Sequence, residues 1–280
     1  FKTGLFNIGA SGQFLLGAFT AIYIGVHWTF LPPSISWMVA LVGATVAGAL
    51  WASIAGLLKA FRNVNEVITS IMLNYIGVFF VNYMIVQTVF DQTRNQSVQP
   101  LNAFIPRGFF ETLLPRTGVH VGFIIAIVVA ILMWVIIAKT TFGFELRAVG
   151  LNKSSARYAG VNEKQKIVYS MMIAGALAGL GGGLLYLSNT GITIQVLDVI
   201  PTEGFLGIPV ALLASSNPIG IIFSALFLAH LQTGGFYMQV LFPIQIVDVM
   251  IGVIIYFSAF AIIMKSFIDK YLKRHGGKNA

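Results

Sequence analysis

The sequence of 280 residues is 57% hydrophobic and 9% charged, whereas an ordinary soluble domain carries roughly 25% charged residues. Its polar side chains are too few to cover a water-soluble globule, so the composition excludes that class and indicates a membrane protein. The absence of cysteine excludes a disulfide framework and a thiolate metal site. The net charge of +8 lies mainly in connections between apolar segments, so it does not indicate a nucleic-acid partner.

Six apolar segments have about the 20 residues that cross a bilayer as a helix. They cover residues 9–30, 35–58, 66–90, 118–139, 167–189 and 243–264. Two shorter segments, 204–214 and 219–232, flank the turn sequence "SSNPIG" and predict a pair of short or re-entrant helices.

These segments predict an all-α, polytopic helical membrane protein with about eight transmembrane or re-entrant helices. We expect a single transmembrane domain over residues 1–280. The amino end, "FKTGLFNIGASGQF", has neither an initiator Met nor a signal-peptide pattern, so we expect at least one more span upstream. On the fifth span, Gly175, Gly179 and Gly183 are spaced four apart and predict close packing between helices.

The basic residues gather in three connections. Thirteen of the seventeen Lys and Arg residues follow the second span, separate the fourth span from the fifth, or follow the last span. Such an excess of positive charge marks cytoplasmic connections. We therefore place a loop at 140–166 and a basic tail at 265–280 in the cytoplasm.

Catalytic signatures are missing from the sequence. It has no G-x-x-x-x-G-K-[ST] loop for a nucleotide phosphate, no H-E-x-x-H and no G-x-S-x-G. The four histidines are scattered along the chain rather than clustered, and a metal site needs several converging ligands. The sequence therefore predicts a conduit rather than an enzyme, without a metal or cofactor of its own.

Polar side chains inside apolar spans predict a path for a neutral, hydrogen-bonding solute. Asn74 and Asn82 fall within about 80° of each other on a helix of 3.6 residues per turn, and Asp248 is an acid inside a span, where a carboxylate marks a functional site. Two alternatives stay open: the amides bond to neighbouring helices, and Asp248 is solvated near the outer end of its span. The candidate path residues are Asn7, Gln13, Ser70, Asn74, Tyr75, Asn82 and Asp248.

The polar run at 142–166 predicts a short cytoplasmic helix over "KSSARYAGV". Asn152 is expected to cap its start, Gly160 to end it, and Asn162 to cap the next helix. We expect Ala156, Tyr158 and Ala159 to be exposed beside Arg157. Exposed aromatic and Arg side chains are favoured at protein interfaces, so the run reads as a docking site for a soluble partner. The alternative is a basic loop that only enforces topology.

Four stretches carry a family resemblance that extends over most of the chain. "RAVGLNKSSARYAGV" resembles the cytoplasmic coupling segment of bacterial ABC-transporter permeases that serve branched-chain amino acids, simple sugars and nucleosides, with Ser155 and Val161 as mild departures. "GLFNIGASGQFLLGA", "NEVITSIMLNYI" and "GFLGIPVALLASSNPIG" also look like this family, although Pro209 and Ala214 depart from its usual residues. The residues that the resemblance implies for ATPase coupling are Arg147, Gly150, Asn152, Ser155, Ala156, Arg157, Tyr158, Ala159 and Gly160.

The resemblance implies a division of labour among several chains. Two permease subunits, identical or different, would form the path, and cassette ATPases carrying ATP and Mg²⁺ would bind the coupling segments. An extracytoplasmic substrate-binding (lipo)protein would deliver the solute. This chain would then be a multi-pass protein of the bacterial cytoplasmic (inner) membrane, in contact with membrane lipid, and an ATP-driven importer subunit working by alternating access.

The nature of the solute is less defined than the family. "NEVITSIMLNYI" and "FNIGASGQ" are closer to the nucleoside and sugar branch, and the Asn-rich third span suits a nucleobase or polyhydroxylated solute. We expect a nucleoside first, a simple sugar second and an amino acid third. An ATP-independent carrier or channel, which would depend on Asp248, and a scaffolding membrane protein are the alternatives from other classes.

Overall fold

A computed structural model describes residues 1–115 and 117–239, and beyond these 243, 245–247, 249–254, 256, 257 and 260. Asp248, the tail 265–280 and parts of the predicted span 243–264 lie outside the described residues. The chain divides into two compact units, Phe1–Phe205 and Leu206–Ala280. The expected single domain over 1–280 stays a prediction.

Five helices in the described part are long and apolar enough to cross a membrane, which confirms the polytopic helical class. They are α2 (Pro33–Arg62), α3 (Glu66–Thr88), α5 (Gly122–Lys139), α8 (Glu163–Tyr186) and α10 (Pro218–Met238). The first four match predicted spans. The fifth has 21 residues and replaces the short arm expected at 219–232, because the helix continues to Met238.

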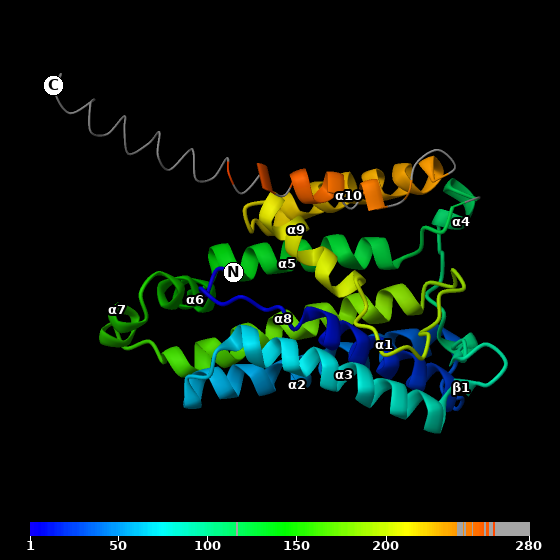
Figure 1. Ribbon diagram of the computed structural model, residues 1–280, viewed down its shortest axis with the longest axis horizontal. Helices are drawn as coiled ribbons and strands as arrows, with labels where there is room; N and C mark the ends of the chain where they lie inside the picture. The colour runs from blue at the N-terminus through cyan, green and yellow to red at the C-terminus, as the bar shows by residue number, and fades with distance from the viewer. Residues whose placement is uncertain are drawn as a thin grey trace, which may run out of the picture. The chain divides into compact units, whose positions relative to one another are not determined.

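Helix α8 packs against α1 (Ala10–His27) and α2, and Figure 1 shows these helices side by side with α3. The glycine spacing on α8 explains the close approach to α2. A Cβ added to Gly179 would lie 3.0 Å from the Cα of Gly48, and one added to Gly183 would lie 3.0 Å from the Cβ of Ala44. Where lipid gives no hydrophobic drive, such backbone proximity is a main source of packing energy. The close packing predicted from the glycine spacing is confirmed.

Helix α1 begins beside the middle of α3 rather than at its end. Gly9, the N-cap of α1, provides no side-chain hydrogen bond, and the backbone N–H of Gly12 instead donates to Oδ1 of Asn74 at 2.9 Å. At its far end, Nε2 of His27 lies 3.2 Å from the carbonyl oxygen of Thr88, the last residue of α3. Residues 1–9, which precede α1, are not helical.

The connection between α2 and α3 is a tight turn set by two asparagines. Asn63 adopts a left-handed backbone conformation with φ 51° and ends α2. Asn65 then caps α3, because its side chain accepts a hydrogen bond from the backbone N–H of Val67 at 2.9 Å. Glu66, at the first position of α3, pairs with Lys59 at 2.8 Å across the turn.

The connection between α3 and α5 contains the only strands among the described residues. β1 (Phe90–Asp91) and β2 (Gln96–Ser97) form an antiparallel hairpin, which is a small addition to the expected all-α fold. A 3₁₀ turn η1 (Leu101–Ala103) and the one-turn helix α4 (Phe110–Leu113) follow. Asp91 begins the turn of the hairpin, because its Oδ1 accepts the backbone N–H of Thr93 at 3.0 Å.

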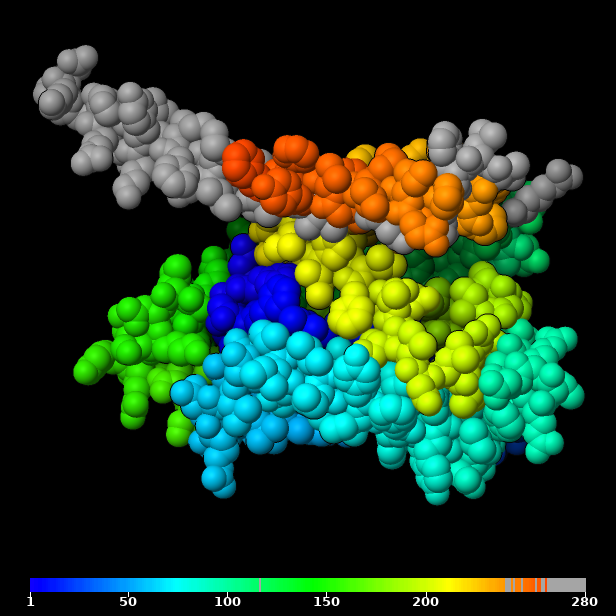
Figure 2. Space-filling model, in the orientation of Figure 1, coloured from blue at the N-terminus to red at the C-terminus, as the bar shows by residue number. Residues whose placement is uncertain are grey.

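Two short helices, α6 (Thr141–Leu151) and α7 (Lys153–Tyr158), join α5 to α8. Figure 2 shows this green segment projecting at one end of the first unit. Sequence reasoning predicted the second helix and missed the first. Helix α6 follows α5 directly. Thr140 caps its start, because the Thr140 hydroxyl accepts the N–H of Gly143 at 3.1 Å.

Helices α9 (Glu203–Leu213) and α10 account for the predicted pair around "SSNPIG". Ser215 and Ser216 adopt positive φ values of 51° and 55° in the turn, and Asn217 caps α10 by accepting the N–H of Ile219 at 3.1 Å. Helix α9 has 11 residues, which is too short to cross a bilayer at 1.5 Å per residue.

Candidate functional site

Helix α7 begins at Lys153, as the sequence predicts, and ends at Tyr158, three residues before the predicted end. Oδ1 of Asn152 accepts the N–H of Ser155 at 3.0 Å, and Oδ1 of Asn162 accepts the N–H of Gln165 at 3.2 Å at the start of α8. Gly160 lies between the two helices with φ +84°, a conformation that glycine adopts without strain. The predicted short helix, its cap at Asn152 and the cap of the next helix at Asn162 are therefore confirmed.

The side chains of α7 divide into an exposed tip and a buried anchor. Tyr158 is 94% exposed, and Ser155, Arg157, Ala159 and Gly160 around it are also exposed. Ala156 is only 4% exposed and belongs to a core cluster with Leu5, Val149 and Ile167. The expectation that Ala156 is exposed was wrong, because a one-and-a-half-turn helix needs one apolar face against the bundle to stay in place.

Arg147 and Gly150 belong to α6 and lie away from this tip. A Cβ added to Gly150 would lie 3.0 Å from the Cα of Thr3, and one added to Gly4 would lie 3.2 Å from the carbonyl oxygen of Gly150. Nε of Arg147 donates to the carbonyl oxygen of Gly143 at 3.4 Å, within the same helix. These two predicted coupling residues therefore hold α6 together and against the amino-terminal segment, and they are not part of the exposed tip.

Ionic contacts attach α6 and α7 to α8. Lys166 on α8 pairs with Glu145 on α6, and its Nζ lies 4.6 Å from the centre of the Phe142 ring. Arg157 and Glu163 approach to 3.9 Å, but the Arg157 side chain is 77% exposed, so this pair contributes little. The strongest of these contacts joins α6 to α8, and α7 is held mainly by the packing of Ala156 with Leu5 and Ile167.

The predicted path residues near α1 form a closed set of hydrogen bonds. Nδ2 of Asn7 donates to Oε1 of Gln13 at 2.8 Å, and Nε2 of Gln13 returns a bond to Oδ1 of Asn7 at 3.1 Å. Asn74 accepts the N–H of Gly12 and donates to the carbonyl oxygen of Ile8 at 3.0 Å. These amide side chains therefore bond to neighbouring segments, which was one of the two alternatives. Their contact with a solute stays a prediction.

The other path residues on α3 differ in their surroundings. Ser70 is fully buried, and its Oγ has no hydrogen-bond partner among the described residues. Tyr75 is 50% exposed and so does not share the buried face that holds Ser70 and Asn74. Asn82 is 8% exposed, and its Nδ2 donates to the carbonyl oxygen of Leu197 at 3.0 Å and to Oδ1 of Asp198 at 3.1 Å.

Sequence reasoning missed the segment that follows α8. The hydroxyl of Ser11, in the first turn of α1, donates to the carbonyl oxygen of Pro201 at 2.8 Å. Because α1 starts beside the middle of α3, Pro201 lies well below the outer end of α3. Gly204 also lies close to Ser11, since a Cβ added to it would be 2.7 Å from the backbone N of Ser11.

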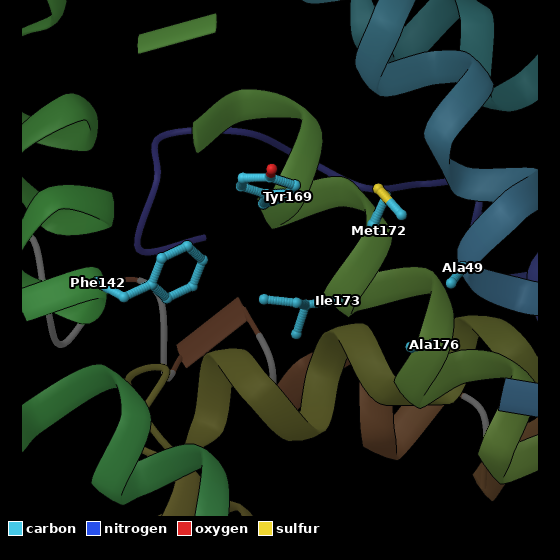
Figure 3. A pocket seen from close by; sticks show the side chains of 6 residues that line it. All are labelled: Ala49, Phe142, Tyr169, Met172, Ile173 and Ala176. Atoms are coloured by element: carbon cyan, nitrogen blue, oxygen red, sulfur yellow. The ribbon is translucent and has the colours of Figure 1, made fainter. Parts of the chain in front are cut away.

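A cavity of about 420 Å³ lies beside α8 on a different surface. Figure 3 shows its apolar lining, with Phe142 of α6 facing the α8 side chains. Such a lining suits a hydrocarbon group and offers nothing to a polar solute. The lining residues are Ala49, Phe142, Tyr169, Met172, Ile173 and Ala176.

Several apolar helices that are long enough to cross a bilayer define a multi-pass membrane protein. The chain belongs to the family described as "Branched-chain amino acid transport system / permease component", which matches residues 1–259. Members of this family are multi-pass proteins of the inner membrane. The family resemblance stated from the sequence is thereby confirmed.

Individual relatives match almost the whole chain. The guanosine ABC transporter permease protein NupP of Bacillus subtilis is 38% identical over 98% of this chain and 79% of its own length. The nucleoside ABC transporter permease protein NupB of Lactococcus lactis is 38% identical over 96% of this chain and 76% of its own. The glucose ABC transporter permease protein TsgB13 of Haloferax volcanii is 32% identical over 96% and 72%. No solved structure matches the chain.

Proposed function

We propose that the chain is a permease subunit of an ATP-driven ABC importer that moves nucleosides across the inner membrane by alternating access. The observation that carries this proposal is the similarity to permeases named for guanosine and nucleosides along nearly the full length of the chain.

The exposed tip of α7 is the proposed docking point for a cassette ATPase. Tyr158 stands out at 94% exposure on a helix that is anchored through Ala156 and tied to α8. Closure of the ATPase pair would push this tip and tilt α8 with it. ATP and Mg²⁺ would be bound by the ATPase chains, and this chain would have no catalytic role and no cofactor of its own.

The remaining partners complete the importer. A second permease subunit, identical or different, would form the other half of the path, and an extracytoplasmic binding protein would deliver the solute to the outer end. Lipid would surround the exposed apolar faces of the spans. A sugar importer is the second candidate, because the glucose permease also matches 96% of the chain.

Copurification tests the docking proposal. The unmodified chain, purified gently from its native membranes, is expected to bring a cassette ATPase with it, and a Tyr158→Ala, Gly160→Trp double variant is expected to lose that partner. Phe30→Ala removes an aromatic side chain that is 76% exposed in the connection between α1 and α2, and it should retain the ATPase. The proposal fails if the ATPase is absent from the unmodified chain or stays with the double variant.

Uptake by the complete importer in proteoliposomes tests the solute. We expect ATP-dependent accumulation of labelled guanosine or uridine, and little accumulation of leucine. Accumulation of glucose without nucleosides would move the assignment to the sugar branch. Uptake that proceeds without ATP would instead support a carrier.

A further inference from the structure

The apolar cavity beside α8 adjoins an ion pair at the end of that helix. Lys166, in the first turn of α8, pairs with Glu145 of α6, and its Nζ lies 4.6 Å from the centre of the Phe142 ring. Phe142 also lines the cavity together with Tyr169, and the centres of these two rings are 6.3 Å apart. Phe142 therefore lies between the ion pair and the cavity.

The ion pair and the cavity share one face of α8. Lys166 is followed at spacings of three, four and three residues by Tyr169, Ile173 and Ala176, which line the cavity (Figure 3). Residues three and four apart lie on the same side of a helix. From Lys166 to Ala176 the helix rises about 15 Å, which is half of the roughly 30 Å hydrocarbon core of a bilayer. This face therefore has the length of one leaflet, with charges at its end and an apolar hollow beyond them.

The cavity adjoins side chains that are exposed on the spanning helices. Ala49, which lines it from α2, lies between Val46 and Leu50, and these two side chains are 50% and 60% exposed. All of the lining residues belong to the first compact unit, Phe1–Phe205. The volume of about 420 Å³ falls within the range of about 300–1,000 Å³ for ligand cavities. Its apolar lining suits a hydrocarbon chain.

The ion pair can meet a headgroup that carries both signs of charge. The side chains of Lys166 and Glu145 are 15% and 33% exposed, and the Phe142 ring holds the Lys166 ammonium group at a cation–π distance. A phosphate accepts hydrogen bonds from Lys166, and an ammonium group donates to the carboxylate of Glu145. The four charges then alternate in sign. Such a network contributes more than a single exposed pair.

We infer that this face of α8 binds one phospholipid whose headgroup carries a primary ammonium group, as in phosphatidylethanolamine. The phosphate of the lipid contacts Lys166, its ammonium group contacts Glu145, and one acyl chain lies in the cavity beyond Phe142. Basic pockets at the ends of spanning helices are known sites for lipid headgroups. The inference goes beyond the proposed function and requires only that the chain spans a membrane, so it does not depend on the solute.

The headgroup rather than the acyl chain sets the selectivity of this site. A lipid chain is already surrounded by hydrocarbon, so its entry into an apolar cavity brings no hydrophobic gain and only closer packing. A primary ammonium group has N–H donors for a carboxylate, whereas the trimethylated headgroup of phosphatidylcholine has none. Phosphatidylglycerol is anionic and brings no positive charge to Glu145. The site therefore favours phosphatidylethanolamine over both.

Lipid retention by the purified complex of both permeases with the ATPases tests the inference. The complex is reconstituted in an equal mixture of phosphatidylethanolamine, phosphatidylcholine and phosphatidylglycerol with the same acyl chains. Native mass spectrometry in mild detergent then identifies the lipid that stays bound. We expect phosphatidylethanolamine to be retained roughly 10-fold over phosphatidylcholine, the lower end of the range for a hydrogen bond to a charged group. Equal retention of these two lipids, or a preference for phosphatidylglycerol, would overturn the inference.

Glu145→Gln tests the contact with the ammonium group. The change keeps the shape of the side chain and removes its charge, so the preference for phosphatidylethanolamine over phosphatidylcholine should disappear. Glu66→Gln is the matched control, because Glu66 pairs with Lys59 at 2.8 Å in the turn between α2 and α3, and neither residue lines the cavity. It should retain the preference. If Glu145→Gln also retains it, or if both variants lose it equally, the headgroup does not bind at Glu145.

Ala176→Leu tests the place of the acyl chain. The larger side chain fills the cavity from α8, so retention of all three lipids should fall. Ala49→Leu fills the same cavity from α2 and should have the same effect, so the result does not depend on the folding of one variant. Val86→Leu, on an exposed part of α3 away from the lining, is the control and should retain the lipid. Normal retention in both filled variants, or loss of the second permease subunit from both, would contradict a lipid chain in the cavity.

The outcomes distinguish this inference from the proposed function. Selective retention of phosphatidylethanolamine by a complex that transports no nucleoside would keep the inference and remove the proposed function. ATP-driven nucleoside uptake by a complex that retains the three lipids equally would do the reverse.

Discussion

Helix α7 and the junction where Ser11 contacts Pro201 and Gly204 differ in how far apart in the sequence their contacting residues lie. In α7, the cap, the end and the next cap all lie between Asn152 and Asn162. At the junction, the hydrogen bond from Ser11 to Pro201 joins residues 190 positions apart. The comparison teaches that α7 is defined by residues close together in the sequence, whereas the junction depends on contacts between residues far apart in it.

The largest loss of stability is expected from Asn74→Leu, because Asn74 bonds to the backbone at the start of α1. The change leaves the N–H of Gly12 and the carbonyl of Ile8 without their partner, and each unsatisfied buried group costs about 1–3 kcal/mol. We expect a destabilisation of about 2–4 kcal/mol, measured as a lower melting temperature of the purified complex. Met72→Leu, on the exposed face of the same helix, should melt with the unmodified protein; equal melting of both variants would mean that α1 does not depend on this cap.

Gly204→Ala should have the next largest effect, because it separates the first turns of α1 and α9. The new Cβ would lie 2.6 Å from Oγ and 2.7 Å from the backbone N of Ser11, so the backbones must move apart at about 1–3 kcal/mol. Gly207→Ala is the matched control on the same helix, since among the described residues nothing lies within 4 Å of the added Cβ. If Gly204→Ala proves as stable as Gly207→Ala, the close contact of the two helices is wrong.

Most of the segment between α5 and α8 was predictable from residues close together in the sequence. Asn and Gly at the right offsets are sufficient to predict a short helix at 153–158, and the spans follow from runs of apolar residues. Burial within that helix was not predictable for Ala156, because its partner Leu5 lies far away in the sequence. The contacts of residues 195–202 were missed for the same reason, since Asn82 and Ser11, which bond to Leu197 and Pro201, lie more than 100 positions away in the sequence.

A smaller effect on stability is expected at the coupling end from Gly160→Val. Gly160 has φ +84° with open space around it, so the variant suffers backbone strain of about 1–2 kcal/mol rather than a clash. Gly160→Asn should lose less, because Asn tolerates the left-handed region. Comparison of the two variants for ATPase copurification and melting temperature tests the turn; a bulky side chain without effect on either measurement would remove Gly160 from the coupling site.

Tyr158→Ala should have the smallest effect on stability and a large effect on transport. It therefore separates the docking role proposed for α7 from any role in the fold. The side chain is 94% exposed, so the free energy of unfolding should change by less than about 0.5 kcal/mol.

An exposed aromatic side chain at the centre of an interface can nevertheless contribute about 2 kcal/mol or more to binding. We therefore expect an unchanged melting temperature for the isolated permease, together with weaker ATPase binding and slower ATP-driven uptake. Solute binding should remain intact, because the Tyr158 side chain is exposed at one end of the first unit and lies outside the spanning helices. A variant that keeps its ATPase and its uptake would show that energy enters the membrane by a different surface.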